Sequence, residues 1–302
     1  MITTVVLAVY AFLAGAVVPA PLSRARWTHR SPVLSVLAWQ GLMVTFVVAT
    51  MLAVYHLVLT EQHAHAGLVG LLTLCGLAAD ATVGGAVPTL SDTPAPVAAA
   101  AVVLLPVVRL ARCAWRAHRA RLRHLDLLAL VGEPAPEHGA TVVDHHVPAV
   151  YCLPGRYRRV VVTRGALDVL SEEQLRAVLE HERAHLRGRH HLPRLWTDAF
   201  SRAFPGLPLA RHAEEQTALL VEMIADDRAL RSHARETLAT AMYAVAAGRV
   251  PRAALGAGGA GALIRLGRIL APQPRPRRLT RLGVLAATAT APLLPLLVAC
   301  GH

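Results

Sequence analysis

The chain of 302 residues contains no lysine, so every one of its 31 basic side chains is an arginine. With 19 acidic residues, the formal net charge is +12. A basic excess of this size can indicate a nucleic-acid partner. Here, however, the arginines cluster at the ends of apolar stretches, which is typical of membrane proteins. We therefore expect the lipid bilayer as a partner and no direct contact with nucleic acid.

Cysteine is also scarce, and its four positions show no CxxC spacing. The four residues are scattered over apolar and polar stretches of the chain: Cys75, Cys113, Cys152 and Cys300. This pattern excludes the dense, regularly spaced cysteines of small disulfide-rich domains. We expect no disulfide framework.

Apolar sequence is abundant instead. Hydrophobic residues make up 54% of the chain, and several stretches approach the roughly 20 residues that cross a bilayer. We predict spans at about 2–20, 33–59, 95–111 and 282–300. The first span lacks the basic start of a signal peptide and a second span follows closely, so we expect it to be retained. The segment 60–94 is assigned to an outer loop or a re-entrant segment, because its apolar part, 66–79, is too short to span.

Three arginine clusters predict the orientation of these spans. They lie after the first span, after the third and before the last: Arg24, Arg26 and Arg30; Arg109, Arg112, Arg116, Arg119, Arg121 and Arg123; Arg275, Arg277, Arg278 and Arg281. Because arginine-rich loops stay in the cytoplasm, all three clusters should face it. The sequence thus predicts a multi-pass protein of the cell membrane with both termini outside. Its parts are a membrane region at 1–111, a cytoplasmic domain at 112–281, and a fourth transmembrane helix with a short outer tail at 282–302.

One pentapeptide indicates a chemistry. Residues 181–185 read His-Glu-Arg-Ala-His, the HExxH pattern of zinc peptidases. On a helix, residues four apart lie about 40° from each other around the axis, so His181 and His185 can bind one metal ion. Glu182 is turned by about 100° and would lie beside the open metal position, where a water molecule sits. The spacing therefore suits metal-assisted hydrolysis.

The residues before the motif predict that it lies inside a helix. Ser171 and Gln174 have the spacing of a capping box, and two glutamates occupy the first turn, where the helix dipole favours them. An apolar stripe continues through the motif, and no glycine or proline interrupts before Gly188. We predict a helix of about 17 residues.

A catalytic zinc site needs a third protein ligand. Glu222 and Asp226 lie four residues apart in a downstream apolar helical run, where an isolated carboxylate is costly to bury without a partner. Glu222 would be the ligand, and Asp226 could accept a hydrogen bond from the free ring nitrogen of a zinc histidine. The alternative is that both are surface residues of an amphipathic helix. The upstream motif favours the ligand interpretation.

The order of these elements resembles a known family. The resemblance rests on Tyr151-Cys152-Leu153-Pro154-Gly155, then Arg159-Val160-Val161-Val162-Thr163, then the HExxH helix, then Glu222 with Asp226. This order is similar to the membrane-embedded peptidases of the BlaR/MecR type and, more distantly, to the HtpX group of integral-membrane gluzincins. It covers about residues 95–300.

The resemblance implies a mainly α integral membrane protein with about four transmembrane helices and a cytoplasmic α+β gluzincin-like peptidase domain with a small β-hairpin or sheet. It implies one Zn²⁺ held by His181, His185 and Glu222, with Glu182 activating the water. The implied reaction is hydrolysis of a peptide bond in a cytoplasmic protein, such as a transcriptional repressor. The BlaR/MecR receptors also carry a penicillin-binding sensor domain, which we do not expect here. Two alternatives stay open: an HtpX-like quality-control protease, and a catalytically inactive membrane receptor or scaffold.

The hairpin predicted from 150–153 and 159–163 has two compatible roles. It can pack over the helices, or its edge strand can pair with an extended substrate peptide. The Gly- and Pro-rich stretches 255–262 and 271–276 are interpreted as connectors. His190 and His191 follow the motif, but on a continued helix His190 would lie about 140° round from His185. They are interpreted as surface residues.

Overall fold

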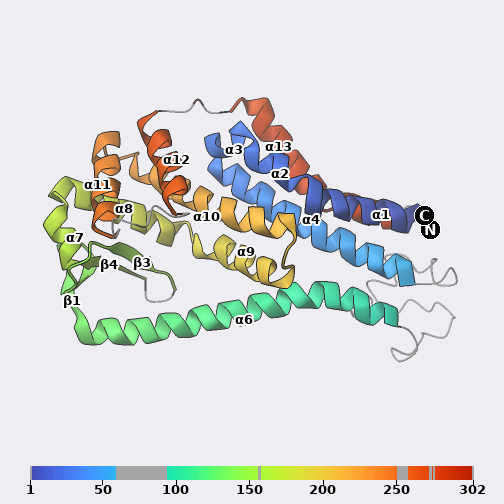
Figure 1. The fold of residues 1–302 in the computed structure, drawn as a ribbon, viewed down its shortest axis with the longest axis horizontal. Helices are drawn as coiled ribbons and strands as arrows, with labels where there is room; N and C mark the ends of the chain where they lie inside the picture. The colour runs from blue at the N-terminus through green and yellow to red at the C-terminus, as the bar shows by residue number, and fades with distance from the viewer. Residues whose placement is uncertain are drawn as a thin grey trace.

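The computed structural model describes residues 2–58, 94–155, 158–249, 258–271, 274 and 276–300. Within these ranges the chain is mainly helical and carries one small sheet (Figure 1). The elements used below are α1 (Ile2–Phe12), a π-helical stretch (Leu13–Val17), α2 (Pro19–Arg24), α3 (Arg26–Arg30), α4 (Pro32–Val58), α6 (Pro94–Val131), β1 (Gly132–Ala135), β2 (Ala140–Val143), β3 (Val150–Leu153), β4 (Arg159–Thr163), α7 (Arg164–Val169), α8 (Glu172–Arg187), α9 (His191–Ala203), α10 (Pro208–Ala229), α11 (Arg235–Arg249), α12 (Gly258–Leu270), α13 (Arg278–Thr290) and α14 (Leu294–Cys300).

Two helices near the N-terminus, in the described part of the chain, are long and apolar enough to cross a bilayer. They are Ile2–Arg24, which combines α1, the π-helical stretch and α2, and Pro32–Leu57 in α4. Both correspond to predicted spans, and α1 packs against α4. The predicted outer or re-entrant segment 60–94 lies outside the described residues except for its last position.

The predicted third and fourth spans do not correspond to single helices with the predicted bounds. The third lies in the first half of α6, which continues through Pro106 and the predicted boundary at 111 and extends along one side of the molecule (Figure 1). The fourth is divided into α13 and α14, because Pro292 interrupts the run of backbone N–H donors. Neither belongs to the two helices above, so these two spans stay predictions.

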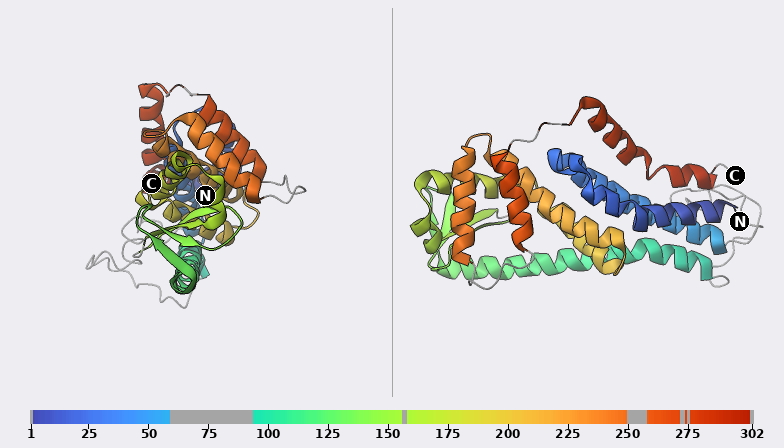
Figure 2. Two further views of the ribbon diagram at one scale, coloured as in Figure 1. Left: turned by 90° about the vertical axis from the view of Figure 1, so that its left-hand side faces the viewer. Right: turned by 45° about the horizontal axis from the view of Figure 1, so that its top comes forward.

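The molecule is elongated, with the sheet at one end and both ends of the chain at the other (Figures 1 and 2). The strand order is β1-β2-β4-β3. The predicted hairpin is confirmed, since β3 and β4 pair antiparallel with Val150 opposite Val162. β1 and β2 were not predicted, and β2 runs parallel to β4. Among the strands that the structure describes, β3 pairs with β4 alone and thus forms an edge of the sheet.

Two apolar clusters hold the helices that carry the candidate site. One lies between the sheet and α8, where Val162, Leu175 and Leu179 are buried together. The other lies between α4, α9 and α10, where Trp39 and Phe200 are fully buried. α8, which packs in the first cluster, and α10, which packs in the second, contact each other. Packing in two separate apolar clusters therefore holds α8 and α10 side by side.

α12 begins inside the stretch 255–262, for which a connector was predicted. The helix spans Gly258–Leu270, so the connector interpretation of 255–262 is wrong from Gly258 onward. Ile269 explains the difference: it is fully buried among residues of α8, α10 and α11, and this tertiary packing stabilises a helix whose glycines argue against it.

Candidate metal centre

The capped helix predicted around the HExxH motif is confirmed. Ser171 and Gln174 form a reciprocal capping box, in which the Ser171 N–H donates to Gln174 Oε1 at 2.9 Å and the Gln174 N–H donates to Ser171 Oγ at 3.3 Å. The helix runs from Glu172 to Arg187. The motif therefore lies within regular helix, with His181 and His185 on one face. Arg183 points away from them and donates to the carbonyl of His138 at 2.6 Å.

Three predicted ligands converge on one point. The Nε2 atoms of His181 and His185 lie 3.1 Å apart. Nε2 of His181 lies 3.4 Å from Oε2 of Glu222, and Nε2 of His185 lies 3.4 Å from Oε1 of the same carboxylate. In a tetrahedral zinc site with bonds of about 2.0–2.1 Å, ligand atoms lie roughly 3.4 Å apart. The three side chains therefore fit a single zinc ion, and theirs is the one such His/Cys/Asp/Glu group found within the described ranges.

The structure places Asp226 behind His181. Its Oδ1 is 3.0 Å from Nδ1 of His181, although the ring and the carboxylate are not aligned for a hydrogen bond. The Asp226 side chain is only 1% exposed. The nitrogen of His181 that faces Glu222 is thus left free for a metal, while the other faces a buried carboxylate. This is the usual arrangement behind a metal-bound histidine.

The charges of the centre are strongly coupled. Burial alone would lower the pKa of the His181 imidazole, but contacts with Asp226 and Glu222 outweigh burial and raise that pKa to about 9. Burial alone would raise the pKa of Glu222, but contacts with the two histidines hold it below its usual range. The pKa of Asp226 is also lowered, since Arg265 and His181 outweigh the effect of burial. The centre thus holds ionised carboxylates around a cation, which can be a proton or a metal ion.

Glu182 lies beside the three ligands and next to β3. Burial raises the pKa of its carboxyl group, although the two neighbouring histidines oppose this. The Cys152 thiol on β3 faces Glu182, and burial, reinforced by that carboxylate, raises the pKa of the thiol to about 12. Cys152 is therefore a neutral neighbour of Glu182. A buried carboxylate with a raised pKa is suited to take up a proton from water.

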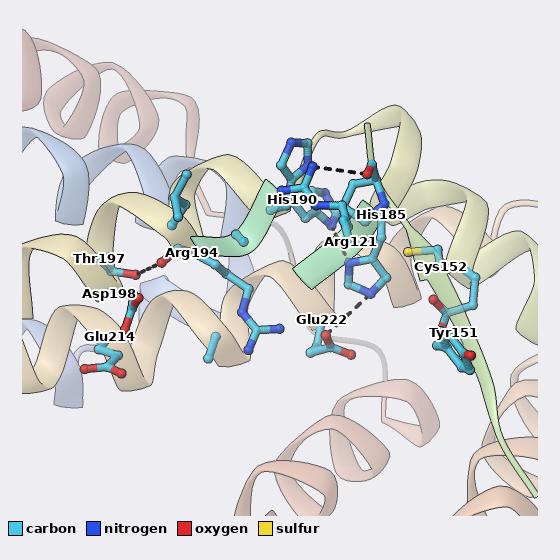
Figure 3. A pocket seen from close by; sticks show the side chains of 16 residues that line it. Arg121, Tyr151, Cys152, His185, His190, Arg194, Thr197, Asp198, Glu214 and Glu222 are labelled. Atoms are coloured by element: carbon cyan, nitrogen blue, oxygen red, sulfur yellow. Dashed lines mark hydrogen bonds and ion pairs between the residues drawn. The ribbon is translucent and has the colours of Figure 1, made fainter. Parts of the chain in front are cut away.

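A cavity of about 570 Å³ opens onto the centre. It is lined by side chains from α6, β3, α8, α9 and α10. In Figure 3, His185 and Glu222 face each other, with Tyr151 and Cys152 of the edge strand on one side and Arg194 of α9 on the other. The cavity therefore brings the edge strand together with Glu182 and with two of the candidate ligands, His185 and Glu222.

His190 is not a surface residue, and that interpretation was wrong. Its side chain is 6% exposed, and its Nδ1 lies 2.9 Å from Nδ1 of His185. His190 does not continue the helix, because α8 ends at Arg187. Arg189 then adopts a left-handed φ of 50°, which returns His190 toward His185. Gly188 leaves room for the ring, since a Cβ there would meet Nε2 of His190 at 2.3 Å. His185 therefore has a neutral partner behind it, because burial lowers the pKa of His190 to about 4.

Arg265 on α12 is a second residue that the sequence analysis missed. Its guanidinium contacts both Glu222 and Asp226. Its position in a stretch next to glycines, some forty residues after Asp226, gave no local signal. The only available indication was that a buried Glu-xxx-Asp pair requires a cationic partner as well as a metal.

A sequence model of peptidase family M48 matches residues 115–223. The matched stretch runs from α6 to α10 and includes His181, Glu182, His185 and Glu222. Members of this family are typically zinc metallopeptidases, so the match supports a metallopeptidase with a protein substrate. It does not distinguish the BlaR/MecR type from the HtpX group. No curated protein and no solved structure matched the chain.

Proposed function

We propose that the protein is a membrane-embedded zinc metalloendopeptidase that hydrolyses peptide bonds of a cytoplasmic protein. The observation that carries the proposal is the spacing of three donor atoms. The two imidazole nitrogens and the Glu222 carboxylate lie 3.1–3.4 Å apart, and His185 and Glu222 line a cavity. A structural zinc site would use four protein ligands, whereas three ligands beside a cavity leave a position for water and substrate.

The proposed mechanism assigns one role to each side chain. When bound, the metal would supply a Lewis acid for the scissile carbonyl and lower the pKa of a water to about 7. His181, His185 and Glu222 would hold it. Glu182 takes the proton of the attacking water at its carboxylate and then delivers that proton to the leaving amide nitrogen. Asp226 orients His181 from behind.

The edge strand β3 is the proposed docking site for the substrate chain. No strand among the described residues pairs with it on the side away from β4, and its residues Tyr151 and Cys152 line the cavity. An extended peptide that pairs with this edge gains backbone hydrogen bonds that do not depend on its sequence. The cavity side chains then select which residues flank the scissile bond.

The membrane setting is part of the proposal. The two apolar helices near the N-terminus and the three arginine clusters support a multi-pass protein of the cell membrane with its peptidase domain, 112–281, in the cytoplasm. On this topology the substrate is a cytoplasmic protein, and a transcriptional repressor is the proposed case. DNA itself is not a proposed partner.

The test compares the protein termini of cells that produce the wild type with those of cells that produce Glu182→Gln. One dominant new terminus, in a cytoplasmic protein, is the expected result. Many new termini spread over membrane proteins would instead indicate quality control of the HtpX kind. Identical termini, together with a purified protein that contains no zinc, would indicate an inactive receptor or scaffold and would refute the proposal.

His190 gives a separate prediction about the metal. If the His185 ring binds the metal through Nε2, its Nδ1–H would donate to Nδ1 of His190, so removing this acceptor should loosen the ring. We expect His190→Phe, which keeps the ring volume, to weaken zinc binding about 10–100-fold, as is typical for partners behind a ligand. Chelator competition on the purified protein measures this affinity.

His191→Phe is the matched control, because His191 makes no contact with His185 that the structure records and should keep the wild-type zinc affinity. His190→Asp, which restores an acceptor, should recover part of the loss. Equal affinities of wild type and His190→Phe would show that His190 only fills space.

A further inference from the structure

Arg265 joins the two carboxylates on which the candidate centre depends. Its Nε lies 2.9 Å from Oδ2 of Asp226, and its Nη2 lies 2.8 Å from Oδ1. Its remaining nitrogen, Nη1, lies 3.0 Å from Oε2 of Glu222. All three guanidinium nitrogens are therefore used in the site, and the Arg265 side chain is only 16% exposed. Figure 1 shows α12, which carries it, lying against α10.

The charge of the centre requires such a cation. Three carboxylates, those of Glu182, Glu222 and Asp226, lie around one position for a divalent ion. One further positive charge balances the third carboxylate. Without it, Glu222 and Asp226 would repel each other across one helical turn in a buried place, and one of them would take up a proton or turn away.

The contacts of Arg265 also fix the orientation of the Glu222 and Asp226 carboxylates. Arg265 occupies Oε2 of Glu222, while Oε1 faces Nε2 of His185 at 3.4 Å. On Asp226, Arg265 shares Oδ1 with Nδ1 of His181. The planar fork of a guanidinium makes these three contacts in fixed directions, whereas the ammonium of a lysine cannot reproduce their geometry.

We propose that Arg265 is a positioning residue of the metal centre, which orients Glu222 directly and His181 through Asp226 and thereby strengthens the binding of a divalent metal ion. This inference rests on the proposed zinc function. The proposal predicts the opposite effect on metal affinity from simple charge repulsion. A cation near a metal site repels the metal, so the charge of Arg265 alone would weaken metal binding.

A second arginine of the same helix provides the matched control. Arg268 lies one turn after Arg265 and binds the carboxylate of Asp227 with two hydrogen bonds of 2.7 and 2.8 Å. It thus docks α12 on α10 by the same chemistry but touches none of the candidate ligands. If Arg265 served only to dock the helix, loss of Arg268 should have the same effect on the centre.

The experiment measures zinc affinity by chelator competition on the full-length protein in detergent, for the wild type, Arg265→Ala, Arg265→Lys and Arg268→Ala. We expect Arg265→Ala to bind zinc about 10–100-fold more weakly, as for other groups that orient a ligand. Arg265→Lys should also bind more weakly than the wild type, and Arg268→Ala should match it. With Co²⁺ in place of Zn²⁺, the visible absorption, which reports ligand geometry, should change for both Arg265 variants and stay unchanged for Arg268→Ala.

Several results would overturn the inference. If Arg265→Ala binds zinc as tightly as the wild type or more tightly, Arg265 does not orient the ligands. If Arg268→Ala loses as much zinc affinity as Arg265→Ala, the role of Arg265 is only to dock α12.

If limited proteolysis shows that Arg265→Ala is unfolded, Arg265→Lys is the deciding variant. Wild-type zinc affinity and a wild-type Co²⁺ spectrum in Arg265→Lys would then reject the inference. If the wild type binds zinc and cleaves protein but the Arg265 variants match it, only this inference fails. If the wild type binds no zinc, the proposed function fails with it.

Discussion

Glu182→Gln should abolish peptide-bond cleavage while the protein keeps its zinc. The substitution preserves the size of the side chain but removes its ability to accept a proton, and general acid–base catalysis contributes about 10²–10⁴-fold to such a reaction. Zinc should stay, because the three candidate ligands are His181, His185 and Glu222 and not Glu182. The fold should also tolerate the change, since the pKa of Glu182 is raised by burial and a neutral side chain is less costly there. Initial cleavage rates and the zinc content of the purified variant measure the two effects.

Glu180→Gln is the matched control for this variant. Glu180 lies on the same helix but pairs with Arg187 instead of facing the candidate ligands. A partly exposed ion pair contributes little to stability, so this variant should cleave at the wild-type rate. If Glu182→Gln cleaves as fast as Glu180→Gln, the proton-transfer role is wrong even where zinc is bound.

The part of the site that the sequence could predict follows from local geometry. The capping box at Ser171 and Gln174 fixes where α8 begins, and the helical period then places two histidines on one face. The hairpin β3–β4 was also predicted, because its strands are adjacent in the chain and rich in β-branched residues. In each case the interacting residues lie within a few positions of each other or repeat with a known period.

The remainder depends on tertiary structure that a single sequence does not encode locally. β2 pairs directly with β4 in parallel, and because β3 lies between them in the chain, the partner of β2 is distant in the sequence. His190 contacts His185 only because the helix ends and Arg189 turns the chain back. Arg265 reaches Glu222 and Asp226 from a helix that exists because Ile269 is buried. The candidate ligands and Asp226 could thus be proposed from the sequence, whereas His190 and Arg265 could not.

This division has a physical cause. A metal ligand must have one of a few side-chain types at a spacing that a helix imposes, so the sequence restricts it strongly. A supporting group needs only to place a donor or acceptor at the right point, and histidine, arginine or a backbone group from any element can do so. The candidate site therefore uses two different kinds of partner behind its two histidines: the Asp226 carboxylate, neutralised by Arg265, behind His181, and a neutral imidazole behind His185.

His185→Ala should lose the metal and, with it, all cleavage. Removing one of three ligands leaves His181 and Glu222, which cannot enclose the ion, and water must replace a strong nitrogen donor. The loss of zinc affinity should therefore exceed the about 10–100-fold that follows from removing a group behind a ligand. Elemental analysis should find about one zinc per wild-type chain and almost none in the variant at the same free zinc concentration.

His212→Ala is the control that separates this effect from a general loss of histidine. His212 lies on α10, the helix of Glu222, but its Nδ1 lies 4.0 Å from Oε2 of Glu215 and it is not among the candidate ligands. It should keep both zinc and cleavage. Zinc that is undiminished in His185→Ala would remove His185 from the ligand set. Because the structure brings the donor atoms of His181, His185 and Glu222 together at 3.1–3.4 Å, that result would also require a different explanation for their convergence in a buried place.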